Sequence, residues 1–282
     1  MTKRVLVTGA TGTVGRHLAR RLAAEGVEVG ALCRDPLRAK ELLPAGVEVV
    51  PGDLTDPVSL RDALRDADRA FVVLTDDGGA AFAEAAREAD RLAHLVVLSA
   101  NAPDDPGYDN PLFRKHVLSE ARLTGTGIPL TALRSGPFAS LALQWAPAIR
   151  AAGVVGAVHP SLAVPVIDPR DIADVAVEVL LAAPSACTLS LSGPEVLDTY
   201  DRVRILGEVL GRELAVRRLT EDQWVGAIAG RVPEPYARAL LEVERYLQAS
   251  RPPVQPTVRR VTGHPPRTFR AWAQDNAAAF AA

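Results

Sequence analysis

Three glycines near the start of the chain stand between a short apolar run and a helical pattern. The run is Val5–Val7, and the glycines follow at positions 9, 12 and 15. In such a loop the first glycine permits a tight turn, the second lets the backbone approach a pyrophosphate, and the third lets the next helix pack on the strand. The N-terminus of that helix favours phosphate. The spacing predicts a dinucleotide-binding loop comprising Gly9, Thr11, Gly12, Thr13, Val14 and Gly15.

The alternative is a glycine-rich turn without a ligand. A second apolar run begins about 12 residues after Gly15, as a strand–helix–strand unit requires, and this context favours the binding loop. Similar runs alternate with amphipathic stretches, among them 15–25, 58–66 and 80–93. Alternation of this kind predicts an α/β fold, a doubly wound Rossmann parallel sheet with helices on both faces. The expected strands are Val5–Val7, Val27–Leu32, Val47–Val50, Ala70–Leu74, Leu95–Leu98, Leu130–Leu133 and Cys187–Leu191.

The pattern loosens after about residue 135. Glycines and prolines interrupt residues 145–168, and the chain from Pro194 onward is helical with frequent prolines. We expect a dinucleotide-binding domain over residues 1–155 and a smaller substrate lobe over 156–282. Within the second part, residues of about 164–192 should return to the Rossmann sheet through one more helix and strand. The lobe should pack over the carboxyl edge of the sheet.

The end of the second expected strand bears on the choice of dinucleotide. A carboxylate there accepts from a ribose 2′-hydroxyl, whereas an arginine pairs with a 2′-phosphate. The sequence reads Cys33-Arg34-Asp35-Pro36, and a guanidinium can grip a phosphate through two N–H groups. Arg34 therefore favours NADP(H) over NAD(H) as cofactor. A solvated arginine beside Asp35 is the alternative.

Composition narrows the partners. The net charge is −2, so nothing indicates nucleic acid or an anionic membrane as a partner. The two cysteines, Cys33 and Cys187, lie in apolar runs and are expected to be buried thiols. No stretch of 18 apolar residues and no signal-peptide pattern occurs, so we expect a cytoplasmic protein, a monomer or homodimer that acts on a small molecule.

Later segments extend the pattern set by the glycine loop. Together with Thr8–Gly15, Cys33–Pro36 and Pro51–Leu54, they resemble an atypical short-chain dehydrogenase/reductase of the NmrA-like NAD(P)H-binding family. The resemblance runs from the first strand to the last helix, and the order of the segments is its specific part. These later segments are 116–120, 131–138, 167–173, 191–195 and 263–269.

The resemblance implies a sheet of about seven strands with a small C-terminal substrate lobe. It also implies that Asp53 and Leu54 flank the adenine, and that Leu74 and Thr75 follow the fourth strand beside the cofactor. For Asp53 alone, an ordinary turn or cap residue is the alternative. Gly136 should lie beside the nicotinamide, although Arg134-Ser-Gly-Pro departs from the family's usual Arg-Pro-Gly.

Short-chain dehydrogenases usually carry a serine after the fifth strand and a Tyr-x-x-x-Lys pair on the next helix. Ser99 stands where that serine should be, but the chain has only three lysines and none follows a tyrosine at this spacing. Leu112 and His116 occupy the places of the pair. With an unperturbed pKa of about 6.5, His116 is a candidate proton donor. Pairing of His116 with Glu120 and capping by Ser99 are the alternatives.

Substrate contacts and metal ligands are less sharply indicated. Asn101, Phe138 and Trp145 are candidate substrate-binding residues, although both aromatic residues can equally be core. His116 and Glu120 lack a third metal ligand, so no metal site is expected.

These observations support an NADP(H)-dependent oxidoreductase that reduces a ketone or quinone on an apolar or aromatic small molecule. A tailoring ketoreductase of secondary metabolism, whose substrate supplies its own acidic hydroxyl, fits the missing tyrosine. The alternative is a non-catalytic NADP(H)-binding redox sensor or regulator.

Overall fold

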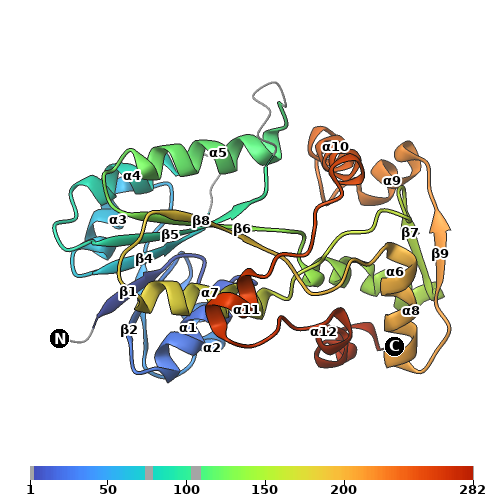
Figure 1. The fold of residues 1–282 in the computed structure, drawn as a ribbon, viewed down its shortest axis with the longest axis horizontal. Helices are drawn as coiled ribbons and strands as arrows, with labels where there is room; N and C mark the ends of the chain where they lie inside the picture. The colour runs from blue at the N-terminus through green and yellow to red at the C-terminus, as the bar shows by residue number, and fades with distance from the viewer. Residues whose placement is uncertain (1–2, 74–78, 103–108, 282) are drawn as a thin grey trace.

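Seven parallel strands form the central sheet of the computed structural model, which describes residues 3–73, 79–102 and 109–281. Their order is β3-β2-β1-β4-β5-β6-β8, so the direction of winding reverses between β1 and β4. The predicted doubly wound Rossmann sheet is confirmed (Figure 1). The strands are β1 (Arg4–Val7), β2 (Glu28–Cys33), β3 (Val47–Pro51), β4 (Arg69–Val72), β5 (His94–Ala100), β6 (Leu130–Ser135) and β8 (Cys187–Leu191).

Helices cover both faces of this sheet. Above it in Figure 1 lie α3 (Pro57–Leu64), α4 (Ala80–Arg87) and α5 (Pro111–Thr124), and below it lie α1 (Gly15–Ala24), α2 (Pro36–Leu42), α7 (Pro169–Leu181) and α11 (Thr257–Thr262). Asp56 caps the start of α3, because its carboxylate accepts from the backbone N–H groups of Val58 and Ser59. Within the described residues no helix is long and apolar enough to cross a membrane.

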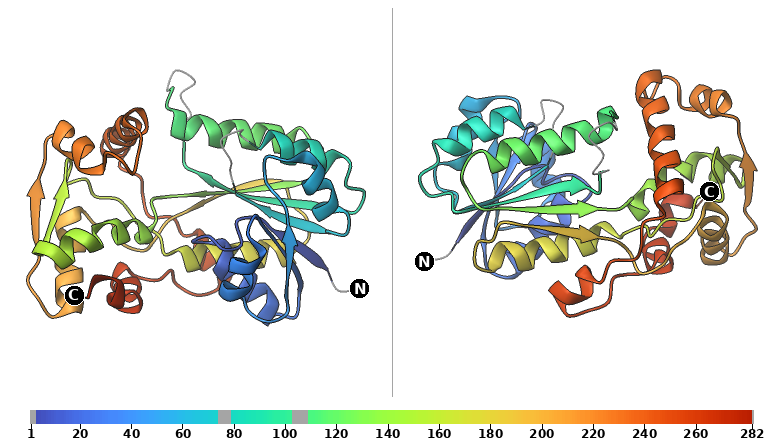
Figure 2. Two further views of the ribbon diagram at one scale, coloured as in Figure 1. Left: turned by 180° about the vertical axis from the view of Figure 1, so that it is seen from behind. Right: turned by 45° about the horizontal axis from the view of Figure 1, so that its top comes forward.

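A smaller lobe stands beyond the carboxyl edge of the sheet. The right view of Figure 2 shows helix α10 (Glu234–Ser250), in orange, standing upright between this edge and the rest of the lobe. Its two parallel strands, β7 (Val154–Ala157) and β9 (Ala215–Arg218), were not predicted. Its helices are η1 (Ala139–Trp145), α6 (Ala146–Ala152), α8 (Thr199–Leu210), α9 (Glu221–Ile228), α10 (Glu234–Ser250), α12 (Phe269–Asp275) and η2 (Ala277–Phe280).

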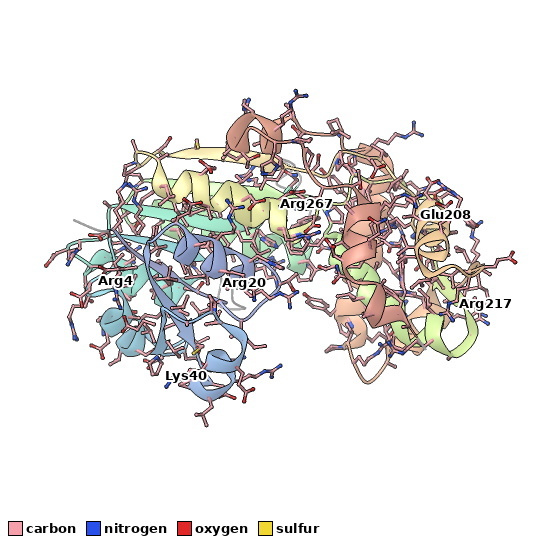
Figure 3. All side chains as sticks on the ribbon, turned by 90° about the horizontal axis from the view of Figure 1, so that it is seen from below. Arg4, Arg20, Lys40, Glu208, Arg217 and Arg267 are labelled. Atoms are coloured by element: carbon pink, nitrogen blue, oxygen red, sulfur yellow. The ribbon has the colours of Figure 1, made fainter. Side chains whose placement is uncertain are left out.

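A buried ion-pair network ties the C-terminal segment back to the sheet layer. Arg267 donates from its guanidinium to both Asp171 and Asp174 of α7, and its backbone N–H donates to Asp171 at 2.8 Å. Arg21 of α1 also reaches Asp174, at 2.8 Å. Figure 3 shows Arg267 beside α7, drawn in yellow. Burial raises the pKa of Asp171 to about 6 against the opposing effect of Arg267.

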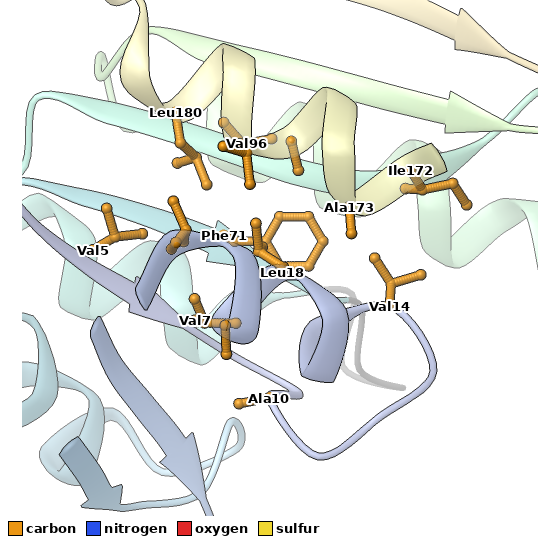
Figure 4. Close-up of a cluster of buried hydrophobic side chains, with 14 of the residues drawn as sticks. Val5, Val7, Ala10, Val14, Leu18, Phe71, Val96, Ile172, Ala173 and Leu180 are labelled. Atoms are coloured by element: carbon orange, nitrogen blue, oxygen red, sulfur yellow. The ribbon is translucent and has the colours of Figure 1, made fainter. Parts of the chain in front are cut away.

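The largest of the three hydrophobic clusters in the described residues lies between the sheet and helices α1 and α7. Leu18 of α1, Phe71 of β4 and Ala173 of α7 meet there and are fully buried (Figure 4). Burying one such large side chain contributes roughly 1.5–3 kcal/mol. A second cluster fills the other face of the sheet, and a third, around Trp272, holds the small lobe together.

The cysteines depart from expectation. Cys33 is half-buried and Cys187 is exposed, because Cys187 opens β8 at the edge of the sheet. The prediction of two buried thiols is therefore wrong for Cys187.

Candidate functional site

The glycine loop between β1 and α1 is wound tightly. Gly9 has φ of +58°, and the N–H of Gly12 donates to its carbonyl at 2.8 Å. A Cβ on Gly15 would lie 2.2 Å from the Gly9 carbonyl oxygen, so a larger residue cannot stand there. No side chain caps the start of α1, where the N–H groups of Arg16 and His17 donate to the carbonyls of Gly12 and Val14 at 3.2 and 3.0 Å. The tight turn suits a dinucleotide pyrophosphate, and of the predicted loop residues Gly9 and Thr11 line the adjoining cavity.

A cavity of about 530 Å³ opens beside this loop at the ends of β2 and β3. Arg34 and Arg38 reach it from the β2 end and from α2, and both are exposed. Asp35 does not pair with Arg34. Its carboxylate instead caps α2 by accepting from the Arg38 N–H. The cavity is lined by Gly9, Thr11, Leu32, Cys33, Arg34, Asp35, Arg38, Leu42, Gly52, Asp53, Leu54 and Thr55.

Asp53 belongs both to the wall of the first cavity and to a local turn. It lines this cavity with Leu54, and its carboxylate also accepts from the backbone and hydroxyl of Thr55 at 2.8 and 2.7 Å. These hydrogen bonds, aided by Arg34, lower the pKa of Asp53. The local turn fixes a carboxylate at the cavity wall.

A second cavity, of about 780 Å³, lies between the carboxyl ends of the central strands and α10. Most of its wall is apolar. Lys115 is the one formally charged side chain among the described residues that line it. The wall comprises Val73, Leu98, Ser99, Ala100, Asn101, Phe113, Lys115, His116, Ser135, Gly136, Pro137, Phe138, Leu141, Pro165, Leu191, Ser192, Tyr236, Leu240, Val243, Tyr246, Leu247, Ser250, Pro252, Pro253 and Gln255.

Ser99 belongs to a hydrogen-bonded group at the bottom of the second cavity. Its hydroxyl donates to Glu120 of α5 at 2.5 Å. Arg134 of β6 holds the same carboxylate through Nε at 3.0 Å and Nη2 at 2.7 Å. The unusual arginine-serine-glycine segment thus anchors Glu120, and Glu120 in turn orients the Ser99 hydroxyl.

His116 lies on the cavity wall but not in the ionic state expected. Burial, followed by the charge of Lys115, lowers its pKa to about 4, so the imidazole is neutral at pH 7. Its Nδ1 is buried with no hydrogen-bond partner among the described residues. Glu120 is engaged by Arg134 and Ser99, and no hydrogen bond in the described part of the chain joins it to His116. The lowered pKa departs from the unperturbed value of about 6.5 that made His116 a candidate proton donor.

The remaining predicted site residues divide into three groups. Asn101, Gly136 and Phe138 line the second cavity. Trp145 is not brought to it, because its ring packs in the core of the small lobe beneath the Arg202 guanidinium, 5.2 Å away. Leu74 and Thr75 lie outside the described residues.

Comparison with known proteins identifies the family of the chain. The model of the NmrA-like family matches residues 1–262. The chain belongs to the NmrA-like family.

Three of the proteins that are similar to this chain come from Streptomyces griseus, Xenophilus azovorans and Escherichia coli. The chain is 39% identical to the (4-alkanoyl-5-oxo-2,5-dihydrofuran-3-yl)methyl phosphate reductase of Streptomyces griseus, over 98% of this chain and 99% of that one. It is 34% identical to the NAD(P)H azoreductase of Xenophilus azovorans, over 99% of each. The fold is similar to that of an NADPH-dependent quinone oxidoreductase of Escherichia coli complexed with NADPH, with a TM-score of 0.82 at 22% identity, over 96% of this chain and 99% of that one.

The sequence alone did not predict that α10 forms one wall of the second cavity in this NmrA-like protein. Helix α10 supplies Tyr236, Leu240, Val243 and Leu247, a stripe with the i, i+4, i+7, i+11 spacing of one helix face. That spacing is readable in the sequence, but it does not say which surface the stripe faces. Among the described residues no group of three or more metal-ligating side chains comes together.

Proposed function

We propose that this NmrA-like protein is an NADPH-dependent reductase of a conjugated carbonyl compound, a quinone or a conjugated ketone, carried on an apolar molecule. The observation that carries the proposal is that the walls of the two cavities adjoin. Gly9 lines the first, and a Cβ on it would lie 2.9 Å from Val73, which lines the second. One elongated dinucleotide can therefore run from Arg34 across the glycine loop to the apolar cavity.

The chain's own residues suit NADP(H). The loop amides would hold the pyrophosphate, Asp53 and Leu54 would border the adenosine end, and the guanidinium of Arg34 is free to grip a 2′-phosphate. Arg34 forms no ion pair with any residue of the described chain, so its charge is available. When bound, NADPH supplies a hydride.

The names of the relatives favour a conjugated acceptor. One relative is named as the reductase of an alkanoyl-oxo-dihydrofuranyl methyl phosphate, and another as an azoreductase. A protein of similar fold is named as a quinone oxidoreductase. Reduction of a conjugated acceptor leaves its negative charge spread over several atoms, so a dedicated tyrosine acid is not essential. A tailoring ketoreductase is included in this class where the ketone is conjugated to an acidic hydroxyl.

Two polar residues of the cavity can serve such a substrate. Ser99 lines the cavity, and its one O–H donates to Glu120, so the hydroxyl must turn away from that carboxylate to donate to a carbonyl oxygen of the substrate. The neutral His116 can offer a hydrogen bond but not the proton of an imidazolium at pH 7. The proton therefore comes from water or from the substrate.

The cofactor assignment is tested with Arg34→Glu. We expect the Kd for NADPH to rise about tenfold or more, since a charge-assisted bond is lost, while the Kd for NADH stays within about twofold. Lys40→Glu is the matched control, because Lys40 is exposed on α2 and does not line the cavity. Equal weakening of both nucleotides by Arg34→Glu would refute a 2′-phosphate contact.

The reductase assignment is tested by turnover. The wild-type protein with NADPH and 1,4-naphthoquinone should oxidise the nicotinamide, followed by its absorbance, and Ser99→Ala should lower kcat by about tenfold or more while leaving the Kd for NADPH unchanged. Tight NADPH binding without turnover over a panel of quinones, azo compounds and conjugated ketones would instead favour the redox sensor.

A further inference from the structure

Lys115 is placed unlike the other two lysines of the chain. Lys3 donates to the Leu181 carbonyl at the surface, and Lys40 is exposed on α2. Lys115 is half-buried on α5, where it lines the second cavity, and its Nζ lies 5.9 Å from the centre of the Tyr236 ring. No carboxylate of the described residues lies within 4.0 Å of it, whereas the guanidinium of Arg114, the preceding residue of α5, is paired with Asp109.

A lone ammonium on an apolar wall is costly. Charge that leaves water for an apolar surrounding needs a counter-charge, and the ring of Tyr236 compensates only in part. The lining residues described here carry no aspartate or glutamate. An anionic group that enters the cavity would supply this counter-charge.

We infer that Lys115 is the anchor for an anionic group on the substrate, a phosphate monoester or a carboxylate, so that the substrate is an anionic amphiphile. This inference rests on the proposed function and adds the substrate's charge to it. A lysine ammonium is a compact point charge with three donors, suited to such oxygens.

The rest of the cavity defines the other end of that molecule. From Tyr236 the apolar stripe of α10 continues through Leu240, Val243 and Leu247, and Phe138 faces it from the sheet side. With the anion at Lys115, an alkyl chain or aromatic ring can extend along this stripe. Ser99 of β5 and His116 of α5 line the same cavity and remain for the group that is reduced.

Binding of simple probes to the NADP+-loaded protein tests this inference without turnover. The probes are 1-naphthyl phosphate, 1-naphthoate and the uncharged 1-naphthol, measured by calorimetry at saturating NADP+ so that the phosphate cannot occupy the cofactor site. We expect at least one anion to bind about tenfold more tightly than 1-naphthol, and the stronger of the two identifies the kind of anionic group.

Three variants locate the preference. Lys115→Met should remove it while leaving the affinity for 1-naphthol within about twofold, and Lys115→Arg should retain it. Arg114→Met, the matched control, removes a positive charge from the next residue of α5, whose guanidinium pairs with Asp109 outside the cavity, and should retain the preference too. Binding of 1-naphthol by Lys115→Met shows that this variant is folded.

Two results would overturn the inference. One is a wild-type protein that binds neither anion more tightly than 1-naphthol, and the other is an anion preference that survives in Lys115→Met. Both leave NADPH binding and quinone reduction untouched, so they are distinguishable from failure of the proposed function.

Discussion

At the scale of single residues, burial sets the chemistry of His116. Its pKa of about 4 in the folded protein lies below the value of about 6.5 expected unfolded. The unfolded chain therefore binds more protons between these values, and the stabilisation present above pH 6.5 is lost as the pH falls towards 4. Relative to His116→Gln, the wild-type protein should lose about 2 kcal/mol of stability between pH 7 and pH 5, measured by urea unfolding.

The same comparison bears on catalysis. Because the imidazole stays neutral, kcat of the wild-type protein should show no ionisation near pH 6.5 that His116→Gln removes. Parallel stability profiles for wild type and variant from pH 7 to 5 would mean that the imidazole is hydrated, and the acid role first expected for it would be open again.

At the scale of elements, the segment before α12 is held to α7 by charge. Asp171 is fully buried beneath Arg267. Arg267→Ala removes the guanidinium that pairs with this carboxylate and keeps only the backbone N–H that donates to it, so we expect a loss of about 3–5 kcal/mol at pH 7 by urea unfolding. The loss should be smaller at pH 5, since the pKa of Asp171 is already raised to about 6 and protonation removes the buried charge.

The control is Arg270→Ala, at an exposed pair with Glu208, which should cost about 1 kcal/mol or less. Equal losses in both variants would contradict this account.

The strands of the large sheet were predictable because their signals are local. Cys187–Leu191 is an apolar run between turn residues, and the structure has the same bounds. The pair β7 and β9 was not predictable, since Val154–Ala157 and Ala215–Arg218 are four residues each and pair across about 60 positions of sequence. Short strands whose stability comes from a distant partner carry little signal of their own.

The residues of the candidate site also differ in how far the sequence predicted them. The glycine loop and Arg34 were predictable, because turn geometry and strand ends place them without help from distant parts of the chain. The ionic state of His116 and the exposure of Lys115 to the cavity were not, because both depend on how α10 packs against α5. A single sequence does not show which face of one helix meets another.

At the scale of the whole molecule, the second cavity exists because the two lobes dock through α5 and α10. Asn110, buried at the start of α5, donates from Nδ2 to the Ala239 carbonyl at 3.0 Å and to Glu242 at 3.1 Å, while its Oδ1 caps α5. Phe113 adds an edge contact with Tyr246, their ring centres 6.0 Å apart. One side chain thus serves both a helix end and the lobe interface.

Two substitutions at Asn110 separate these roles. Serine retains a helix cap but removes the amide that reaches α10, whereas alanine removes both. Asn110→Ser and Asn110→Ala should both weaken 1-naphthol binding several-fold with the Kd for NADP+ unchanged, since the first cavity does not involve α10. Only Asn110→Ala should lose a further 1 kcal/mol or so of stability in urea. Wild-type affinity for 1-naphthol in Asn110→Ser would mean that the aromatic contact alone holds α10 in place, and Phe113→Ala would then be expected to open the cavity instead.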